Sequence, residues 1–288
     1  MSASTRGILA MLASVVVFVF NDALIKLASE TMSPVQAIGL RGIFATLWCV
    51  LAVALSGAWR DVHRVAQPAV ALRGLLEAAA AISFLVALAY IPFGIASAIN
   101  LSTPLFLALL AVLVLGERVG WRRWSAIAVG FAGVLLVIQP DPRDIDGWTW
   151  LVLASSLIGA ARDILGRNVP AIVPTTVVSL SSAITVGLIG CVWTTLDGWQ
   201  PVTALSIAYV IGSSLLLAAG YQLIMLSLRS GAEISLIGAF RYSSVLWALL
   251  IGYVLWGEVP NRLAFAGIAV VIASGLYILH RQRVTQPS

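Results

Sequence analysis

The sequence has 288 residues, of which 60% are hydrophobic and only 10% are charged, and its formal net charge is +5. An ordinary soluble protein has about 25% charged residues and too small a core to bury this much apolar surface. The composition therefore excludes a soluble globular protein and favours an all-α polytopic membrane protein.

Ten apolar segments are long enough to cross a bilayer, which takes about 20 residues per helix. They lie near residues 7–29, 34–56, 69–91, 93–116, 121–139, 148–169, 174–196, 203–229, 232–257 and 262–281. A cleavable signal peptide over residues 1–20 is an alternative for the first segment, but the apolar run continues to Ser29 without a clear small-residue cleavage site. The segments also lack the alternating pattern of a membrane barrel. We therefore predict ten transmembrane helices and no soluble domain.

The distribution of Lys and Arg predicts the orientation, because cytoplasmic loops are rich in these residues. Basic residues flank the loops after the second and fourth segments and the C-terminal tail: Arg60, Arg64, Arg73, Arg118, Arg122, Arg123, Arg281 and Arg283. The opposite side has the acidic loop "DPRDIDG", residues 141–147, and only Arg262 disagrees. Both termini are therefore expected in the cytoplasm, and the net positive charge requires no nucleic-acid partner.

The sequence repeats itself at a constant offset, called the repeat offset here, which places Asp22 on Asp163. With it, "NDALIK" (21–26) aligns with "RDILGR" (162–167), and "LGE" (115–117) with "WGE" (256–258). Between 102–138 and 243–279, ten of 37 positions are identical without a gap. We infer a first repeat over 1–140, a hinge loop over 141–147 and a second repeat over 148–288.

Each repeat has five predicted helices, and this odd number means that the second copy enters the membrane upside down. Inverted repeats of this kind are common in secondary transporters, which bind their substrate near the membrane midplane between the repeats. The expected site lies between helices 1, 3 and 4 of the first repeat and helices 6, 8 and 9 of the second.

Residues 102–138, "STPLFLALLAVLVLGERVGWRRWSAIAVGFAGVLLVI", resemble the C-terminal part of an EamA repeat, the unit of the drug/metabolite transporter superfamily. The second copy retains Gly257 and Glu258 but has Val245 where Pro104 stands, so its helix is expected to be straighter. The resemblance implies a carrier of the bacterial inner membrane, and many such carriers export amino acids and related metabolites.

Asp22 and Lys26 interrupt the first apolar segment, and Asp163 and Arg167 interrupt the sixth at the equivalent positions. A spacing of four residues puts each pair on one face of its helix, where the charges can compensate each other. Charges inside a membrane are costly and face the interior of a helix bundle. Each pair is therefore either a structural ion pair or part of a polar cavity.

Other polar side chains inside the apolar segments extend this cavity. The candidate substrate-binding residues are Asn21, Asp22, Arg41, Glu77, Asn100, Arg162, Asp163, Tyr221, Gln222, Arg241 and Tyr242, and the candidate structural ion-pair residues are Lys26, Arg73 and Arg167. The alternative for each is a contact between helices. Five intramembrane cations (Lys26, Arg41, Arg162, Arg167 and Arg241) face three anions (Asp22, Glu77 and Asp163), which favours a cargo with a negative group.

The fifth and tenth segments, 121–139 and 262–281, have no charge near their centres and several glycines. They are expected at the periphery, facing lipid or a second protomer, so the protein is a monomer or a homodimer through these helices. The expected partners are a small-molecule substrate and the lipid bilayer.

No phosphate-binding loop, metal-ligand cluster or cofactor motif is present in the sequence, so neither ATP hydrolysis nor a resident cofactor or metal is expected. Proton coupling and facilitated diffusion both stay open. An intramembrane enzyme and a channel are disfavoured, because catalytic motifs and rings of like charge are absent. The sequence thus predicts a secondary carrier, with amino-acid export as the first hypothesis and uptake of a nucleoside-type cofactor as the alternative.

Overall fold

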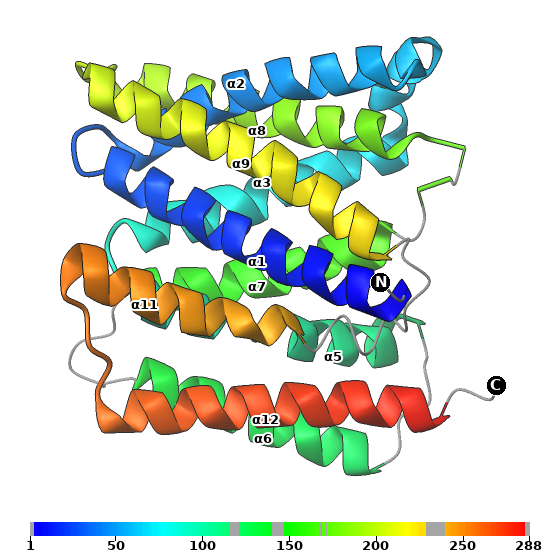
Figure 1. Ribbon diagram of the computed structural model, residues 1–288, viewed down its shortest axis with the longest axis vertical. Coiled ribbons are helices and arrows are strands. Elements are labelled where there is room, and N and C mark those ends of the chain that lie inside the picture. Colours follow the sequence, from blue (N-terminus) through cyan, green and yellow to red (C-terminus); the bar gives the residue numbers. More distant parts are fainter. Residues whose placement is uncertain are drawn as a thin grey trace. The chain divides into compact units, whose positions relative to one another are not determined.

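The computed structural model describes residues 3–115, 121–139, 147–166, 169–170, 172–228 and 240–285. These residues form helices and short connections, with no β-strand among them (Figure 1). The helices are α1 (Ala3–Ala28), α2 (Pro34–Leu55), η1 (Ala58–Ala66), α3 (Pro68–Leu88), α4 (Phe93–Asn100), α5 (Thr103–Leu115), α6 (Trp121–Ile138), α7 (Gly147–Gly166), α8 (Thr175–Asp197), α9 (Ala204–Leu228), η2 (Phe240–Ser243), α11 (Ser244–Trp256) and α12 (Arg262–Thr285).

Five helical stretches in the described residues are long and apolar enough to cross a membrane: Thr5–Ala28, Pro34–Leu55, Pro68–Leu88, Phe93–Val114 and Thr175–Asp197. Shorter apolar helices occupy Trp124–Val137, Ala204–Gly220, Ser244–Trp256 and Arg262–Tyr277. This all-helical, apolar architecture fits a polytopic membrane protein. The count of ten spans and the inverted orientation of the repeats stay predictions.

Proline sets the start of two helices and breaks a third. Pro34 and Pro68 occupy the first helical position, where the missing N–H costs no hydrogen bond. Pro104 instead follows a break at residues 101–102, which divides the predicted fourth segment into α4 and α5. The hydroxyl of Thr103 donates to the Asn100 carbonyl at 2.8 Å, which is the oxygen that the N–H of residue 104 would bind in a regular helix.

The equivalent region of the second repeat also departs from regular α-helix, although it lacks the proline. Within its described residues, η2 is a 3₁₀ turn that leads directly into α11. That this helix is straighter than the α4–α5 region stays a prediction. The N-terminal part of that predicted segment, residues 232–239, lies outside the described residues.

Helix boundaries recur at the repeat offset. α2 and α8 begin at residues 34 and 175, α5 and α11 at 103 and 244, and α6 and α12 at 121 and 262. The two starts in each pair are as far apart in the sequence as Asp22 and Asp163 are. Local structure thus follows the same register as the sequence identity.

The chain forms two compact units, and each contains segments of both repeats. Unit 1 comprises Met1–Val19, Ile91–Leu157 and Ala219–Ser288, and unit 2 comprises Phe20–Tyr90 and Ile158–Ala218. Unit 2 therefore holds α2, η1, α3 and α8 with parts of α1, α7 and α9. Unit 1 holds α4, α5, α6, α11 and α12 with the remaining parts of those three helices.

The centre of unit 2 is a close antiparallel contact between α2 and α8. A Cβ atom added to Gly42 would lie 2.3 Å from Gly187 Cα, and one added to Gly190 would lie 2.7 Å from Gly39 Cα. Residue numbers rise along α2 as they fall along α8, so the two helices run in opposite directions. Only glycine permits this approach of the backbones, as at many helix interfaces in membranes.

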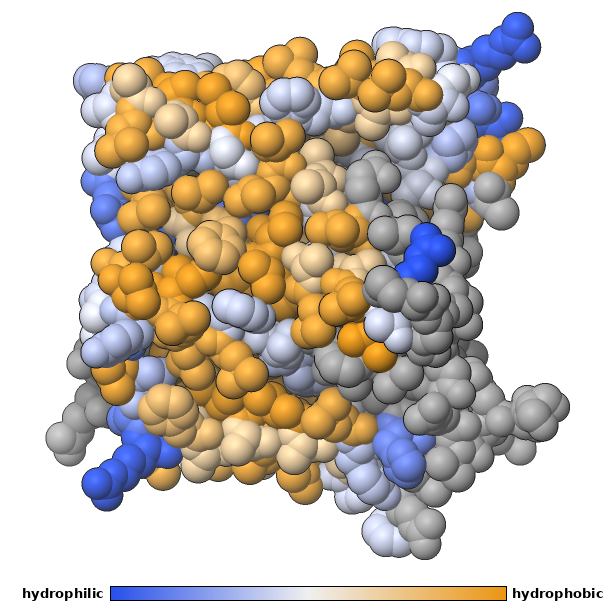
Figure 2. Space-filling model, viewed as in Figure 1, coloured by the Kyte–Doolittle hydropathy of each residue, from blue (hydrophilic) through white to orange (hydrophobic). Residues whose placement is uncertain are grey.

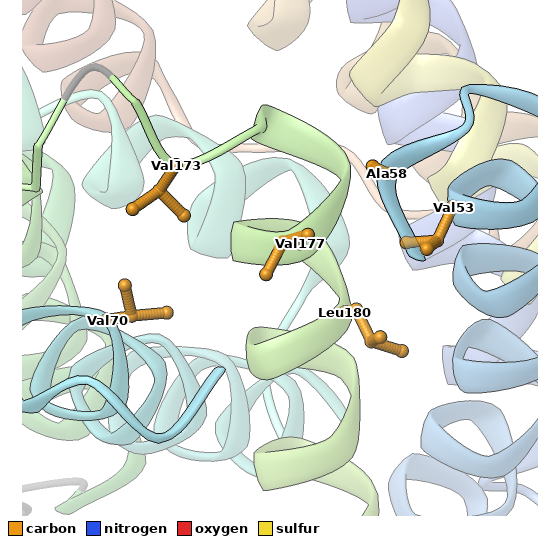
Figure 3. Close-up of a cluster of buried hydrophobic side chains, with 6 residues drawn as sticks. All are labelled: Val53, Ala58, Val70, Val173, Val177 and Leu180. Atoms are coloured by element: carbon orange, nitrogen blue, oxygen red, sulfur yellow. The ribbon is translucent and has the colours of Figure 1, made fainter. Parts of the chain in front are cut away.

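An apolar cluster closes one end of unit 2 (Figure 3). It comprises Val53, Ala58, Val70, Val173, Val177 and Leu180, from α2, η1, α3, α8 and the residues before α8. These side chains are between 0% and 8% exposed. The cluster therefore ties η1 to the helices that carry the polar residues described below.

In unit 1, α6 and α12 lie side by side and antiparallel (Figure 1). A Cβ atom on Gly133 would lie 2.8 Å from Val270, and one on Gly130 would lie 2.7 Å from the Ser274 hydroxyl. Another on Gly267 would lie 2.7 Å from the Gly133 carbonyl oxygen. The glycines that were expected to face lipid or a second protomer are therefore used within the chain, and a dimer through α6 and α12 would have to use other faces of these helices.

Large apolar side chains are exposed on many helices of both units. Figure 2 shows apolar residues over much of the face in view, and exposed examples include Leu55, Leu113, Leu196, Leu246 and Val254. In water this exposure would promote aggregation. It is the surface expected of helices surrounded by lipid.

Candidate substrate site

The first polar cluster of unit 2 surrounds Asp22 and is called the Asp22 cluster here. It comprises Asn21 and Asp22 of α1, Arg41 of α2 and Ser213 of α9. The Asn21 amide donates to Asp22 Oδ1 at 2.8 Å, and its own oxygen accepts bonds from Ser213 Oγ at 2.7 Å and Arg41 Nη1 at 3.5 Å. Arg41 also interacts electrostatically with the Asp22 carboxylate. Asn21 is therefore the link that orients the carboxylate.

The second cluster surrounds Asp163 and is called the Asp163 cluster. Arg162 of α7 donates from Nε to Asp163 Oδ1 at 2.9 Å, and its Nη1 lies 3.1 Å from both oxygens of Glu77 on α3. Arg73, also on α3, lies 3.8 Å from Glu77 and donates to the Ser182 hydroxyl of α8 at 3.1 Å. Two guanidinium groups and two carboxylates of α3 and α7 thus form one network, which reaches α8 through the Ser182 hydroxyl.

The two clusters correspond to each other through the repeat. The repeat offset relates Asp22 to Asp163, α1 to α7, α2 to α8 and α3 to α9. The Asp22 cluster joins α1 and α2 to α9, and the Asp163 cluster joins α7 and α8 to α3. Each cluster therefore takes two helices from one repeat and the third helix from the other.

The predicted ion-pair residues have different surroundings from one another. Arg73 lies 3.8 Å from Glu77, and the closer and bidentate partner of Glu77 is Arg162. Lys26 is buried on α1, with 9% of its surface exposed. Arg167 lies outside the described residues. The proposed Asp163–Arg167 pair therefore stays a prediction, and the described partner of Asp163 is Arg162.

Asn100 lies in unit 1, at the break between α4 and α5. Its side-chain oxygen accepts hydrogen bonds from the Ser156 hydroxyl at 3.2 Å and the Thr103 hydroxyl at 3.3 Å. The residue is exposed in the structure. It therefore presents an oriented amide at an interruption of a membrane helix, which is where transporters often bind their cargo.

The remaining predicted binding residues also belong to unit 1. Tyr242 is only 4% exposed, and a Cβ on Gly275 of α12 would collide with its hydroxyl, so this ring fills the space above a glycine and favours a packing role. The side chains of Tyr221, Gln222 and Arg241 lie outside the described part of the structure, and their predicted roles are untested.

The described ionic contacts involve only some of the charges for which a positive excess is predicted. In the Asp163 cluster, the charges of Arg73 and Arg162 are matched by Glu77 and Asp163. In the Asp22 cluster, one guanidinium faces one carboxylate. The charges of the Asp163 cluster are therefore balanced, and the excess over the whole set, which includes Lys26, Arg167 and Arg241, stays a prediction.

Ser213 and Ser182 are members of these clusters that the sequence reading missed. Serine is common in membrane helices, and its hydroxyl often binds its own backbone, so composition does not distinguish the two roles. A usable signal was available in the repeat, because Ser182 and Arg41 are equivalent at the repeat offset. No group of three or more metal-ligating side chains was found among the described residues.

Comparison with known proteins identifies the type of protein. Residues 5–139 match the model of the EamA-like transporter family. The chain therefore resembles the EamA-type transporters of the drug/metabolite transporter superfamily. It is 23% identical to the S-adenosylmethionine uptake transporter of Rickettsia prowazekii over 98% of this chain and 95% of the relative.

Two further relatives have other cargoes in their names. The chain is 27% identical to the riboflavin transporter of Rhizobium johnstonii, over 78% of this chain and 71% of the relative. It is 25% identical to the pseudopaline exporter CntI of Pseudomonas aeruginosa, over 93% of both chains. A solved crystal structure matches 99% of both chains with a TM-score of 0.67 and 17% identity, which supports the fold. These bacterial relatives and the apolar helices fit a transporter of the bacterial inner membrane.

Proposed function

We propose that this chain is a secondary carrier that moves small polar metabolites by alternating access, with export of amino acids as its main activity. The observation that carries the proposal is the pair of repeat-related polar clusters around Asp22 and Asp163. A charged side chain costs several kcal/mol or more in a bilayer. Two charged clusters at equivalent positions of duplicated helices are therefore best explained by a function that both repeats share.

The arrangement of helices supports alternating access. α2 packs antiparallel to its repeat equivalent α8, and α6 packs antiparallel to α12. Two copies inserted in opposite orientations would produce this antiparallel pairing. Inverted repeats allow a carrier to exchange the conformations of its halves and so expose one site alternately to each side.

The chemistry of the clusters favours a zwitterionic cargo. Each cluster presents carboxylate oxygens beside guanidinium groups, and Arg can bind a carboxylate with two parallel hydrogen bonds. An amino acid has one ammonium and one carboxylate group, so it can exchange partners with an internal ion pair without leaving a net charge. A balanced cluster accommodates such a molecule better than it accommodates a simple anion.

Uptake of a nucleoside-type cofactor is the second candidate. It is favoured by the relatives that are named as transporters of S-adenosylmethionine and riboflavin. S-adenosylmethionine itself has an amino-acid group, so the same clusters suit that part of the molecule. The two candidates differ in whether free amino acids compete with the larger compound.

Counterflow in proteoliposomes tests both candidates. Vesicles are loaded with an amino-acid mixture, S-adenosylmethionine or riboflavin, and uptake of the same labelled compound is followed with and without a pH gradient. We expect the wild-type protein to accelerate the exchange of amino acids. Asp22→Asn and Asp163→Asn should each reduce this rate at least tenfold while the protein stays folded. Asp61→Asn on η1, which removes an ion pair outside the clusters, is the matched control. Exchange of only the larger compounds would select the second candidate, and no exchange of any of them would refute the proposal.

A further inference from the structure

Gly257 and Glu258, the Gly-Glu dipeptide of the second repeat, are not members of the clusters described above, and the equivalent Gly116 and Glu117 lie outside the described residues. In the second repeat, Gly257 has a φ of 65° and ends α11. This left-handed conformation is costly for other residues, so the turn depends on glycine. The Glu258 N–H then donates to the Gly252 carbonyl at 3.1 Å. This turn determines where the Glu258 side chain lies.

The Glu258 carboxylate binds the first residue of another helix. Its Oε2 accepts a hydrogen bond from the backbone N–H of Phe93, where α4 begins. The residue before α4 is Pro92, whose side chain offers no hydrogen-bond acceptor. The first N–H groups of a helix lack partners within the helix, and a carboxylate is stabilised there by the helix dipole. Glu258 therefore supplies the cap that the sequence before α4 does not.

Apolar contacts secure the same end of α4. The ring of Phe93 is fully buried and lies 5.7 Å from that of Trp256, the last residue of α11. A Cβ on Gly94 would lie 2.6 Å from the Leu249 side chain, so α4 and α11 are in close contact. α4 belongs to the first repeat and α11 to the second. The start of α4 is thus seated on the other repeat.

The other end of α4 is the break at residues 101–102, with Asn100 as the last helical residue. α4 has only eight residues and is therefore about 12 Å long. A rigid segment this short is directed mainly by its two ends. Movement at Phe93 is therefore transmitted to the Asn100 amide.

We propose that Glu258 is a positioning residue: by capping α4 from the other repeat, it holds Asn100 in the orientation that binds the cargo. This inference rests on the proposed function, in which Asn100 contacts the transported molecule. A cavity of about 390 Å³ adjoins the cap and is lined by Pro92, Gly94 and Glu258 among others. It provides space into which the first turn of α4 can move when the cap is lost.

Hydrogen exchange and transport together test this role. The variants are Glu258→Ala, Glu258→Asp and Glu258→Gln, and Glu30→Gln in the exposed turn after α1 is the control. We expect amide exchange in residues 93–100 to rise about fivefold in Glu258→Ala, the factor that corresponds to the loss of one helix cap. Exchange in α2 and α8 should stay unchanged. In counterflow of the amino-acid mixture, the KM of Glu258→Ala should rise about fivefold with little change in maximal rate. Glu258→Asp should show smaller increases in both amide exchange and KM.

Several outcomes would overturn the inference. Unchanged exchange in α4 of Glu258→Ala would show that the carboxylate does not seat the helix. Faster exchange in α4 with unaltered transport would remove the link to Asn100. If Glu258→Ala does not fold, Glu258→Gln, which keeps one acceptor oxygen, is measured in its place. Faster amide hydrogen exchange in all helices, rather than in α4 alone, would contradict the proposal. A wild-type protein that transports no amino acid in counterflow would refute the proposed function. The rate of amide hydrogen exchange in α4 would still decide whether Glu258 caps this helix.

Discussion

The Arg162→Gln substitution tests whether the Asp163 cluster is a coupled ion network. Arg162 Nη1 lies 3.1 Å from both oxygens of Glu77, and Nη2 lies 2.8 Å from Asp163 Oδ1. Removing one member of a buried ion pair costs about 3–5 kcal/mol. The Arg162 and Glu77 side chains are 22% and 12% exposed, and Arg73 still faces Glu77, so we expect the lower end of this range, about 3 kcal/mol.

A double-mutant cycle separates the interaction from the cost of each substitution. Glu77→Gln in the Arg162→Gln background removes the carboxylate that has lost its closer partner, so it should recover about 2 kcal/mol of the lost stability. The free energy of unfolding is measured by reversible denaturation in bicelles. The Asp61–Arg64 pair on η1, whose atoms are 2.7 Å apart, is the control and should give a coupling of about 0.2–1 kcal/mol. A coupling below about 0.5 kcal/mol for the Arg162–Glu77 pair would refute the network.

Three further substitutions test the packing of the helices. Gly42→Val should destabilise unit 2 by at least about 3 kcal/mol, because its Cβ would lie 2.3 Å from a backbone atom of α8. The control Gly147→Ala, with no atom within 4 Å of the added Cβ, should be nearly neutral in the same unfolding assay. Trp48→Phe removes the 3.1 Å bond to the Ser214 hydroxyl and should cost about 0.6 kcal/mol, the average for such bonds in membranes. Thr103→Val should cost about 1 kcal/mol by leaving the carbonyl at the proline break without its donor, and Thr103→Ser should restore it in thermal denaturation. Equal stability of the valine and serine variants would contradict that last assignment.

The helix boundaries were predictable because hydrophobic length and proline position both act locally. The predicted segment 34–56 corresponds to α2 (Pro34–Leu55), and 121–139 corresponds to α6 (Trp121–Ile138). The division of the fourth segment could not be predicted from hydropathy, because residues on both sides of the break are predominantly apolar. Its signal was Pro104, whose missing donor is replaced at the Asn100 carbonyl by the Thr103 hydroxyl.

The members of the clusters were only partly predictable. Asn21 and Asp22, like Arg162 and Asp163, are neighbours in sequence, and each charge interrupts an apolar run, so these residues could be found. Their partners on other helices could not, because a helix that is apolar on all sides has no stripe to indicate which face meets a neighbour. The bidentate contact of Arg162 with Glu77, 85 residues away, therefore required the structure.

The two clusters contain different residue types at positions that the repeat offset relates. At the repeat offset, Arg41 corresponds to Ser182, and Arg73 corresponds to Ser214. The first repeat thus has an arginine at each of two positions where the second has serine. Arg41 serves the aspartate of its own repeat, while Arg73 bonds Ser182 and Glu77 in the cluster of the other aspartate.

Because Arg73 of the first predicted repeat belongs to the Asp163 cluster, this cluster depends on residues from both predicted repeats. Arginine at position 182 would place a third guanidinium group beside those of Arg73 and Arg162, and like charges in a medium of low dielectric constant repel strongly. Serine in the second copy avoids this repulsion and still provides hydrogen-bond partners. The Asp163 cluster takes its third helix from the first repeat, so the second repeat by itself would lack Glu77 and leave Arg162 with one carboxylate instead of two. The ionic balance of this cluster is therefore a property of the duplicated chain as a whole.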